Sequence, residues 1–425
     1  MLDLFINKYP VFFDNFNKIN YNRELIEESK EHKTIYVIDK NFGKIKIAKP
    51  RNPLRDARLD LKQCDIRNGE LTVVGFGLGY HIRILLEEYN LTKLEIIVLN
   101  SDVFKWALEN TPGIQEIIND KRVFFKALDF KTTISNLETN LYIHLESAML
   151  FPNELIKTAL LQIRLQKAGG ANNILVPDFH EKENIKNIKK YFPVKQLFNS
   201  NKNKTAYILG AGPSLDDYID FFKNLDDENS IVIVCNTVLT KLITNNISYD
   251  YITLIEMLDK VIENFDKVSD SKKPLISYIY SHSKVLSSYL GKVYVAYHKD
   301  SKNKKLDLGE LHSKGNVIHL STTLAIAMGC NKIRFCGVDF AFSKGMKYGN
   351  GVSSNTKFDK KYYEKLEVLK VKGIESEEVY TSLPYNLPRI YLEQIINENP
   401  QIEFENMGLC GAKINGATQI NMLEM

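Results

Sequence analysis

Two glycine-containing segments have the composition of phosphate-binding turns. Gly210-Ala211-Gly212-Pro213-Ser214 follows the apolar run 207–209, and Gly75-Phe76-Gly77-Leu78-Gly79 follows the apolar run 71–74. Glycine lets the backbone approach a ligand closely, and the free N–H groups at the start of a helix attract anions. We therefore expect the segment 210–214 to join a strand to a helix and to hold a phosphate, although a turn that binds nothing has the same composition.

Neither segment matches a common nucleotide motif. No Gly-Lys-Ser or Gly-Lys-Thr follows residue 214, which argues against an ordinary ATPase or kinase, and Pro213 and Ser214 replace the third glycine of the dinucleotide fingerprint. The segment 75–79 resembles the glycine turn of Rossmann domains that bind nucleosides or S-adenosylmethionine. Those domains place an acid at the end of the next strand, where this chain has Asn100. A purely structural turn is therefore favoured at 75–79, and whether it binds a ligand stays an open question.

Short apolar runs alternate with segments of helical periodicity, which is the pattern of a parallel-sheet α/β fold. In the first half of the chain, 34–48 predicts a hairpin and three runs predict strands, at 71–74, 94–99 and 123–126. The strands predicted in the second half are at 207–209, 231–234, 251–254, 275–279, 293–296, 317–320 and 333–336. A late helix is predicted at 389–398.

The composition describes an ordinary globular chain. Its 425 residues are 44% hydrophobic and 25% charged, with a net charge of +4 that gives no argument for nucleic-acid binding. The five cysteines are scattered without a Cys-x-x-Cys pair, as expected for reduced thiols of a cytoplasmic protein. No apolar run reaches the roughly 18 to 20 residues of a membrane span, and the first residues have no secretory pattern.

The segment 207–216 resembles the opening motif of the Maf (motility accessory factor) flagellin glycosyltransferases and of the archaeal hydroxymethylpterin diphosphokinases. It is also similar to the opening of the bacterial sialyltransferases that use CMP-sialic acid. Further matching motifs follow in the same order, at 235–236, 249–256, 320–329 and 333–340. Two later segments, 371–381 and 406–416, resemble the closing motifs of the Maf family in particular.

This resemblance covers about 205–425 and implies a multi-domain α/β protein. We expect an N-terminal Rossmann-like α/β domain at 1–180, followed by a linker at 181–204. A central doubly wound Rossmann-like domain of the sialyltransferase type is expected at 205–345. The remaining residues, 346–425, form a C-terminal extension that completes the active site or the acceptor surface.

The resemblance implies a bacterial, cytoplasmic protein O-glycosyltransferase. It would move a nonulosonic acid of the pseudaminic or legionaminic type from its CMP-activated donor to serine or threonine of flagellin. Flagellin and the CMP-sugar are the expected partners, with no nucleic acid, no membrane span and no cofactor besides the donor. The eight histidines show no ligand-like pairing with nearby acids or cysteines, so no metal site is expected.

The expected site residues follow from this chemistry, in which CMP leaves as a phosphate monoester whose growing charge must be stabilised. The nucleotide would contact Gly210, Ala211, Gly212, Pro213, Ser214 and Asn236. The donor sugar would contact Ser321, Thr322 and Thr323, which we expect to open a helix. The catalytic candidates are Asp339, Glu256, Tyr348 and His282. A strand-end cap for Asn236, a helix cap for Ser321 and a salt bridge for Asp339 are the structural alternatives.

Three other functions fit parts of the pattern. A sialyltransferase acting on surface glycans would share the donor site but need a sugar-binding acceptor cleft. A pterin diphosphokinase would share the opening motif but consume ATP, and the large N-terminal domain argues against it. A motility factor that binds flagellin without catalysis would need none of the site residues.

Overall fold

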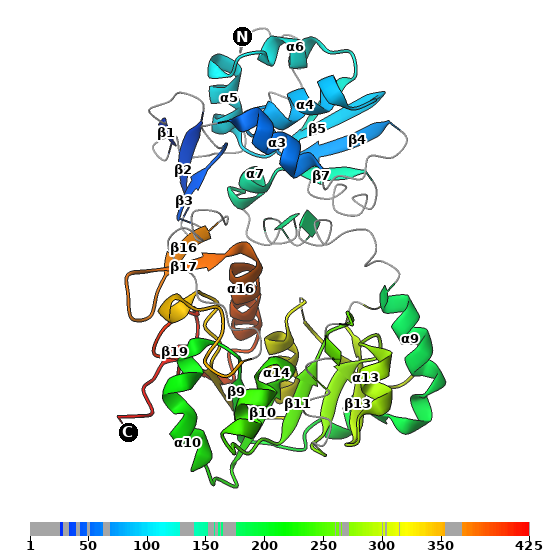
Figure 1. Ribbon diagram of the computed structural model, residues 1–425, viewed down its shortest axis with the longest axis vertical. Coiled ribbons are helices and arrows are strands. Elements are labelled where there is room, and N and C mark those ends of the chain that lie inside the picture. Colours follow the sequence, from blue (N-terminus) through cyan, green and yellow to red (C-terminus); the bar gives the residue numbers. More distant parts are fainter. Residues whose placement is uncertain are drawn as a thin grey trace. The chain divides into compact units, whose positions relative to one another are not determined.

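The computed structural model describes residues 26–28, 34–39, 43–48, 52–62, 69–127, 140–151, 157, 160–161, 163–164, 176–259, 261–262, 265, 272–299, 301, 304–313, 315–352 and 368–424. They form two compact units, 1–171 and 172–425 (Figure 1). Cys64, the turn of the predicted hairpin at 40–42 and the first residues of the chain lie outside the described residues.

The first unit contains two sheets. β1 (Ile26–Glu28), β2 (Ile35–Asp39) and β3 (Gly43–Lys46) form an antiparallel sheet, and the pairing of β2 with β3 confirms the predicted hairpin. A second, parallel sheet has the order β6-β5-β4-β7. Its strands are β4 (Glu70–Val74), β5 (Lys93–Val98), β6 (Val123–Ala127) and β7 (Leu141–Ile143).

Helices connect the strands of this parallel sheet, as the alternating pattern predicts. The connecting helices are α4 (Tyr80–Glu88), α5 (Ser101–Asn110) and α6 (Ile114–Asn119). In the chain, α3 (Pro53–Leu61) precedes β4, and α7 (Leu145–Met149) follows β7. The three predicted strands are confirmed, and the strand order is that of half a Rossmann fold. β7 was not predicted, because its three residues are too short a run to stand out.

The second unit is built on a ten-stranded sheet in which all the described strand pairs are parallel. The order is β14-β13-β12-β11-β10-β9-β15-β18-β19, and β8 also pairs with β13. The strands are β8 (Phe192–Pro193), β9 (Thr205–Leu209), β10 (Ser230–Cys235), β11 (Tyr251–Leu254), β12 (Leu275–Tyr278), β13 (Val293–His298), β14 (Glu310–Leu311), β15 (Lys332–Cys336), β18 (Glu403–Asn406) and β19 (Thr418–Gln419).

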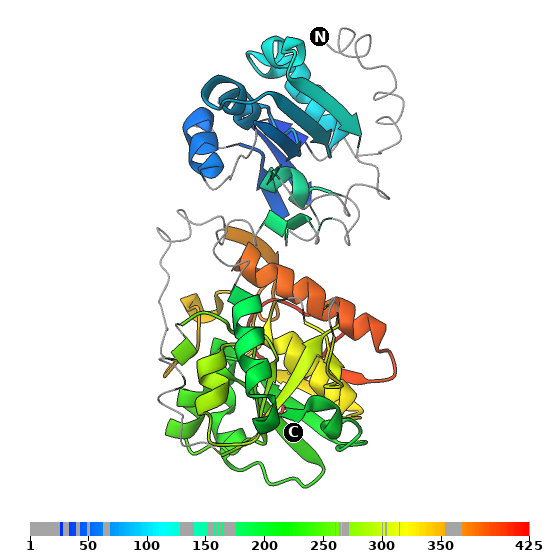
Figure 2. The same ribbon diagram turned by 90° about the vertical axis from the view of Figure 1, so that its right-hand side faces the viewer.

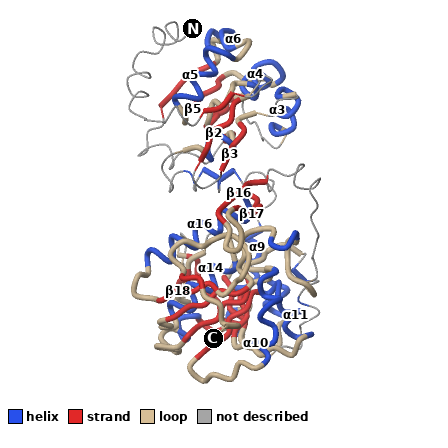
Figure 3. The backbone as a smooth tube through the Cα atoms, turned by 90° about the vertical axis from the view of Figure 1, so that its left-hand side faces the viewer, coloured by secondary structure: helices blue, strands red, loops and turns tan. Residues whose placement is uncertain are grey.

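Both faces of this sheet are covered by helices, so its strands are buried apolar runs. The α-helices are α9 (Val176–Lys186), α10 (Ile219–Lys223), α11 (Leu239–Thr244), α13 (Ser283–Ser288), α14 (Val317–Ala327) and α16 (Leu383–Glu398). Tyr207 and Leu209 face one core with α10, α11 and α13, whereas Ala206 and Ile208 face another with α14 and α16. The strands accordingly form a central layer with helices outside it (Figure 2, Figure 3).

Short 3-10 helices and a hairpin complete the unit. The 3-10 helices are η3 (Ile188–Lys190), η4 (Val194–Leu197), η5 (Pro213–Tyr218), η6 (Asn236–Val238) and η7 (Ser343–Gly345). The hairpin pairs β16 (Val368–Lys372) with β17 (Glu378–Ser382). The predicted α/β class and doubly wound topology are therefore confirmed.

Three expectations differ from the structure. Residues 181–204 are not a linker, because α9 packs into the second unit through Asn184, whose amide donates to the carbonyls of Ile279 and Ser281. The segment 317–320 is the first turn of α14 and not a strand. Its apolar run belongs to a helix buried on most sides, which a short run cannot distinguish from a strand. The extension from 346 onward adds β18 and β19 to the central sheet.

The chain reverses its direction of strand addition at β9. From β9 to β14 each new strand is added on one side, and the chain then crosses to place β15 on the other side of β9. Ligands of open α/β sheets bind at the carboxyl ends of the strands where such a reversal occurs. The topology therefore predicts a ligand site at the loops that follow β9 and β15.

Because these two loops are closely packed, we predict that a side chain at Gly210 strongly destabilises the fold. A Cβ there would lie 2.3 Å from the carbonyl oxygen of Gly337, and neither backbone can move without disturbing the sheet. We expect Gly210→Ala to lower the free energy of unfolding by about 3 kcal/mol in urea titrations. Gly315→Ala is the control, because no atom lies within 4 Å and only its φ of +73° opposes alanine, at about 1 kcal/mol. Equal losses for both variants would contradict this account.

Candidate functional site

The loop 210–214 after β9 packs directly against the loop 337–339 after β15. The N–H of Gly210 donates to the carbonyl of Cys336 at 2.8 Å, and the N–H of Gly212 donates to the carbonyl of Gly337 at 2.7 Å. A Cβ on Gly212 would lie 2.6 Å from Cγ of Asp339. The two glycines are thus required by the neighbouring loop of the same chain.

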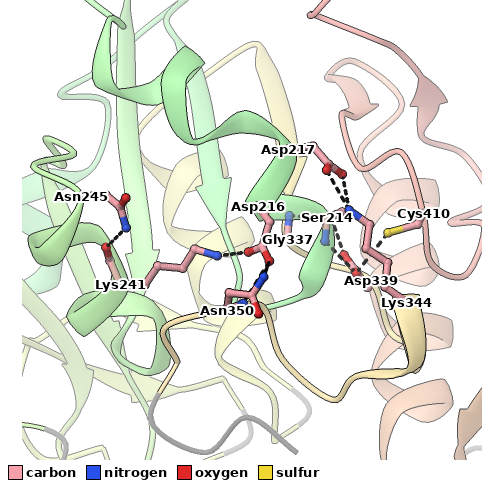
Figure 4. A network of polar contacts seen from close by, with 10 residues as sticks. All are labelled: Ser214, Asp216, Asp217, Lys241, Asn245, Gly337, Asp339, Lys344, Asn350 and Cys410. Carbon is pink, nitrogen blue, oxygen red and sulfur yellow. Dashed lines mark hydrogen bonds and ion pairs between the residues drawn. The ribbon is translucent and has the colours of Figure 1, made fainter. Parts of the chain in front are cut away.

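A buried contact between Ser214 and Asp339 joins the two loops (Figure 4). The Ser214 N–H donates to Oδ2 of Asp339 at 3.1 Å, and the Ser214 hydroxyl donates to Oδ1. The N–H of Gly337 in turn donates to Oγ of Ser214 at 3.1 Å. Ser214 is fully buried and Asp339 is 4% exposed. Burial raises the pKa of Asp339 to about 6, although the hydrogen bonds from Ser214 oppose the rise.

These bonds change the roles predicted for the glycine loop. The N–H groups of Gly210, Gly212 and Ser214 are donated within the chain, so they are not available to a phosphate in this conformation. Pro213 has no N–H. Among the described residues, the N–H of Ala211 has no acceptor. Ala211 is therefore the residue of this loop whose backbone can donate to a ligand.

The segment 344–350, which begins inside η7, lies against the glycine loop. The N–H of Gly349 donates to the carbonyl of Ala211 at 2.8 Å. Asn350 donates to Oδ2 of Asp216 through its N–H at 3.0 Å and its amide at 2.9 Å. Lys344 contacts both carboxylate oxygens of Asp217, at 2.7 and 2.9 Å. The segment 344–350 is thus attached to the loop and to η5 at three places.

Lys241 of α11 also points into this network (Figure 4). Its amino group pairs with Asp216, and its side chain is only 4% exposed. Burial lowers the pKa of Lys241 to about 8. A Cβ added to Gly349 would lie 2.9 Å from Nζ of Lys241 and 3.2 Å from the carbonyl oxygen of Gly212, so all three groups lie close together.

Two predicted site residues lie at the same edge of the sheet as the glycine loop. Asn236 follows β10, the neighbour of β9, and its half-buried side chain makes no hydrogen bond to the described residues. Tyr348 precedes Gly349, which contacts Ala211. Burial raises the pKa of Tyr348, and a hydrogen bond with Tyr385 opposes the rise.

Glu256 and His282 form a separate polar group after β11 and β12. The N–H of His282 donates to the carbonyl of Glu256 at 3.0 Å. Glu256 is exposed, and its Oε1 accepts from the next two backbone N–H groups at 3.0 and 3.2 Å. His282 is buried, with Nε2 2.9 Å from Oδ1 of Asp259 and its ring 4.5 Å from that of His180. No contact between the described residues joins this group to the Ser214–Asp339 pair.

The prediction that three hydroxyl residues open a helix is wrong, and their expected contact with the donor sugar stays a prediction. α14 begins at Val317, so Ser321, Thr322 and Thr323 lie inside it with their N–H groups in the helix. The hydroxyls of Ser321 and Thr322 donate to the carbonyls four residues earlier, at 3.1 and 2.7 Å. The Thr323 hydroxyl donates to the carbonyl of His312 at 2.9 Å.

In the first unit, side chains of the same chain fill the glycine turn 75–79. A Cβ on Gly77, whose φ is +51°, would lie 2.5 Å from Cε1 of His144. A Cβ on Gly75 would lie 2.5 Å from Cβ of Ser147, and the Ser147 hydroxyl accepts from the N–H of Gly77 at 3.1 Å. The whole turn is buried, as expected for a scaffold turn.

Several kinds of site are not found in the described part of the chain. No three His, Cys, Asp or Glu side chains there are grouped so that they could hold a metal ion. The described cysteines, Cys235, Cys330, Cys336 and Cys410, are buried and free. A search of the described helices finds none that is long and apolar enough to span a membrane.

Sequence reasoning missed the charged residues around the glycine loop. Asp216 and Asp217 follow the motif directly and were available as a signal, because acids in the first turn after a glycine loop are well placed to pair with cations. Lys241, Lys344 and Asn350 carried no such signal, because their partners lie 25 to 134 positions away in the sequence.

Comparison with known proteins agrees with the resemblance seen in the sequence. Residues 180–345 match the family described as 6-hydroxymethylpterin diphosphokinase MptE-like, which confirms the predicted relation to that family. Among solved structures, the chain is similar to the Maf glycosyltransferase from Magnetospirillum magneticum AMB-1, with a TM-score of 0.47 and 16% identity over 100% of this chain and 74% of that one. No curated protein matches the chain.

The Ser214–Asp339 contact predicts a stability change whose size depends on pH. Hydrogen bonds from Ser214 hold down the pKa of Asp339, so they stabilise the fold where this carboxyl is ionised, above about pH 6. That contribution is lost as the pH falls below this value. We expect Ser214→Ala to reduce the free energy of unfolding by about 2 kcal/mol at pH 8 and by clearly less at pH 5 in urea titrations.

Two further variants test the assignment. In an Asp339→Asn background the pH dependence of the Ser214→Ala effect should disappear, because no ionisable partner remains. Ser287→Ala, which removes an exposed hydroxyl bonded to the Lys284 carbonyl, should have little effect at either pH. A Ser214→Ala loss that is the same at pH 5 and pH 8 would refute the contact with an ionised Asp339.

Proposed function

We propose that this chain, whose residues 180–345 form an MptE-like domain, is a glycosyltransferase that uses a CMP-activated nonulosonic acid. The acceptor is a serine or threonine hydroxyl of a protein, and the proposed protein is flagellin. The sugar is of the pseudaminic or legionaminic type. The reaction needs no cofactor besides the donor, and it takes place in the cytoplasm of a bacterium.

One observation carries the proposal: hydrogen-bonding groups without a described partner follow the neighbouring strands β9 and β10, at the carboxyl edge where the order of strand addition reverses. The Ala211 N–H has no acceptor among the described residues and suits a phosphate oxygen. The Asn236 amide, which directly follows the neighbouring strand β10, also has no partner in the part of the chain that the structure describes, and it has both donors and an acceptor for a ribose or a cytosine edge. Tyr348 directly precedes Gly349, whose N–H donates to the carbonyl of Ala211 in the same loop.

The chemistry follows from the donor. The bond between the anomeric carbon and the phosphate oxygen breaks, and the electron pair leaves with CMP. Donors fixed at the phosphate stabilise the charge that collects there, and one such donor is typically worth about 10² to 10³ in rate. The acceptor hydroxyl forms the new bond to the anomeric carbon and gives its proton to a base.

We assign the base role to Glu256 and a positioning role to Asp339. Asp339 is buried with both oxygens bonded to Ser214, so it holds the two loops together and has no free face for an acceptor. His282 is buried, and its Nε2 is bonded to Asp259. Glu256 is the exposed carboxylate of the candidates, two strands from β9.

The family match favours a second candidate, the transfer of diphosphate from ATP to a hydroxymethylpterin. That reaction would place a triphosphate at the glycine loop and would require a divalent cation. A sialyltransferase acting on glycans and a flagellin-binding factor without catalysis are the remaining alternatives. The four functions differ in the acceptor that is modified and the nucleotide that is consumed, so an assay of both distinguishes them.

The transfer itself is tested by incubating the purified protein with flagellin and each CMP-nonulosonate in the presence of EDTA. We expect the mass of intact flagellin to rise by that of one or more sugar residues, because the reaction as proposed uses no metal. Modified glycans instead of flagellin would indicate the sialyltransferase. ATP consumption with a hydroxymethylpterin, and no sugar transfer from any donor, would overturn the proposal.

The assigned base gives a second prediction. We expect Glu256→Gln to lower kcat by about 10² to 10⁴, because the amide cannot accept the hydroxyl proton, while the affinity for CMP stays unchanged. Glu228→Gln is the matched control, since Glu228 is an exposed carboxylate in the turn before β10 at the opposite edge of the sheet. A kcat within threefold of the wild type, roughly the scatter of such assays, would remove Glu256 from the mechanism.

A further inference from the structure

Lys241 carries a buried positive charge whose hydrogen bonds are incomplete. An ammonium group has three donors. Within the described residues its hydrogen bond goes to Asp216 alone, and the side chain is only 4% exposed to water. A buried cation with spare donors is unfavourable unless another acceptor reaches it. Something other than the described side chains is therefore expected to complete its coordination.

The location of Lys241 points to the missing acceptor. A Cβ added to Gly349 would lie 2.9 Å from Nζ and 3.2 Å from the carbonyl oxygen of Gly212. Gly212 belongs to the loop in which the N–H of Ala211 has no acceptor among the described residues. The Asp216 carboxylate, its partner, already accepts from Lys241, from the Asn350 N–H and from the Asn350 amide. Asp216 thus accepts three hydrogen bonds and holds the lysine in place, while the remaining ammonium donors have no acceptor among the described residues.

We propose that Lys241 is the cation that binds the phosphate of the nucleotide held at the 210–214 loop. This inference deepens the proposed function, since it rests on a phosphate at that loop. An ammonium is a compact charge that donates to phosphate oxygens, and its charge-assisted hydrogen bonds are about twice as strong as neutral ones. Lys241 on α11 and the Ala211 N–H in the loop after β9 would both donate hydrogen bonds to the leaving phosphate.

The titration of Lys241 can be distinguished from that of its charged neighbours, because their pKa values lie in other ranges. Asp216 on η5, Lys344 on η7, Cys336 at the end of β15 and Asp339 in the loop after β15 act on it. The pKa of Asp339 is about 6, burial raises that of Cys336, and the ion pair with Asp217 raises that of Lys344. Lys241, with a pKa of about 8, is therefore the group of this set that changes charge between pH 7.5 and 9.

The experiment is a calorimetric titration of the full chain with CMP, CDP and ATP at pH 7. We expect Lys241→Met to lower the affinity for whichever nucleotide the wild type binds by roughly 10- to 100-fold. Lys332→Met is the matched control, because Lys332 also forms ion pairs with acids but lies at the amino end of β15. It should bind as the wild type does.

A second measurement separates phosphate binding from a purely structural role. Phosphate favours the charged ammonium, so wild-type affinity should fall as the pH rises through 8, and binding at pH 8.5 should take up a fraction of a proton, measured in two buffers of different ionisation enthalpy. Lys241→Arg, which stays charged, should bind with an affinity that is equal at pH 7 and 9 and without proton uptake. This variant also serves if Lys241→Met does not fold.

The outcomes distinguish the two proposals. Binding of ATP but not of CMP or CDP, lost in Lys241→Met, would support the role of Lys241 and overturn the proposed donor. Binding of CMP that is unchanged in Lys241→Met, or wild-type binding without proton uptake at pH 8.5, would overturn the role of Lys241 and leave the donor. A wild-type protein that binds none of the three nucleotides would overturn both.

Discussion

A buried carboxylate holds the candidate site together. Asp339 lies in the loop after β15 and accepts from both the N–H and the hydroxyl of Ser214, which follows β9. Removing a carboxylate from water is costly, and the two donors of Ser214 offset part of that cost. Because the glycines at 210, 212 and 337 bring the loops into backbone contact, neither loop can move without breaking this bond. The glycine motif is thus explained first by packing within the chain, and Ala211 is the residue of the 210–214 loop whose N–H has no acceptor among the described residues.

The charges around this contact form two ion pairs. The difference in burial between the two pairs indicates which one can bind a ligand. Asp216 pairs with Lys241 and Asp217 pairs with Lys344, so two acids and two lysines surround the loop. The Lys344 pair is partly exposed and links η7 to η5, whereas the Lys241 pair is buried. A buried pair with spare ammonium donors is suited to an anion that arrives with its own acceptors. A nucleotide phosphate has that chemistry, and the amide of Asn236, which follows β10 and has no described partner, is suited to the nucleoside.

Local features of the fold could be predicted from the sequence, and contacts between distant segments could not. The apolar runs at 207–209, 231–234 and 333–336 predicted β9, β10 and β15 because a buried parallel strand is a continuous apolar segment. The same rule failed at 317–320, since a helix buried on most sides has the same composition. It also misplaced Ser321 to Thr323, whose hydroxyls each donate to a carbonyl inside that helix. Lys241 could not be foreseen, because only the fold brings α11 to Asp216.

The central claim is that the edge formed by Ala211, Asn236 and Lys241 binds a cytidine nucleotide through its phosphate. A crystal structure of the protein grown with CMP tests it most directly. The account predicts density for a phosphate oxygen within about 3 Å of the Ala211 nitrogen and for the nucleoside beside the Asn236 amide. CMP density at another place in the chain, or a site filled by ATP in crystals that exclude CMP, would contradict it.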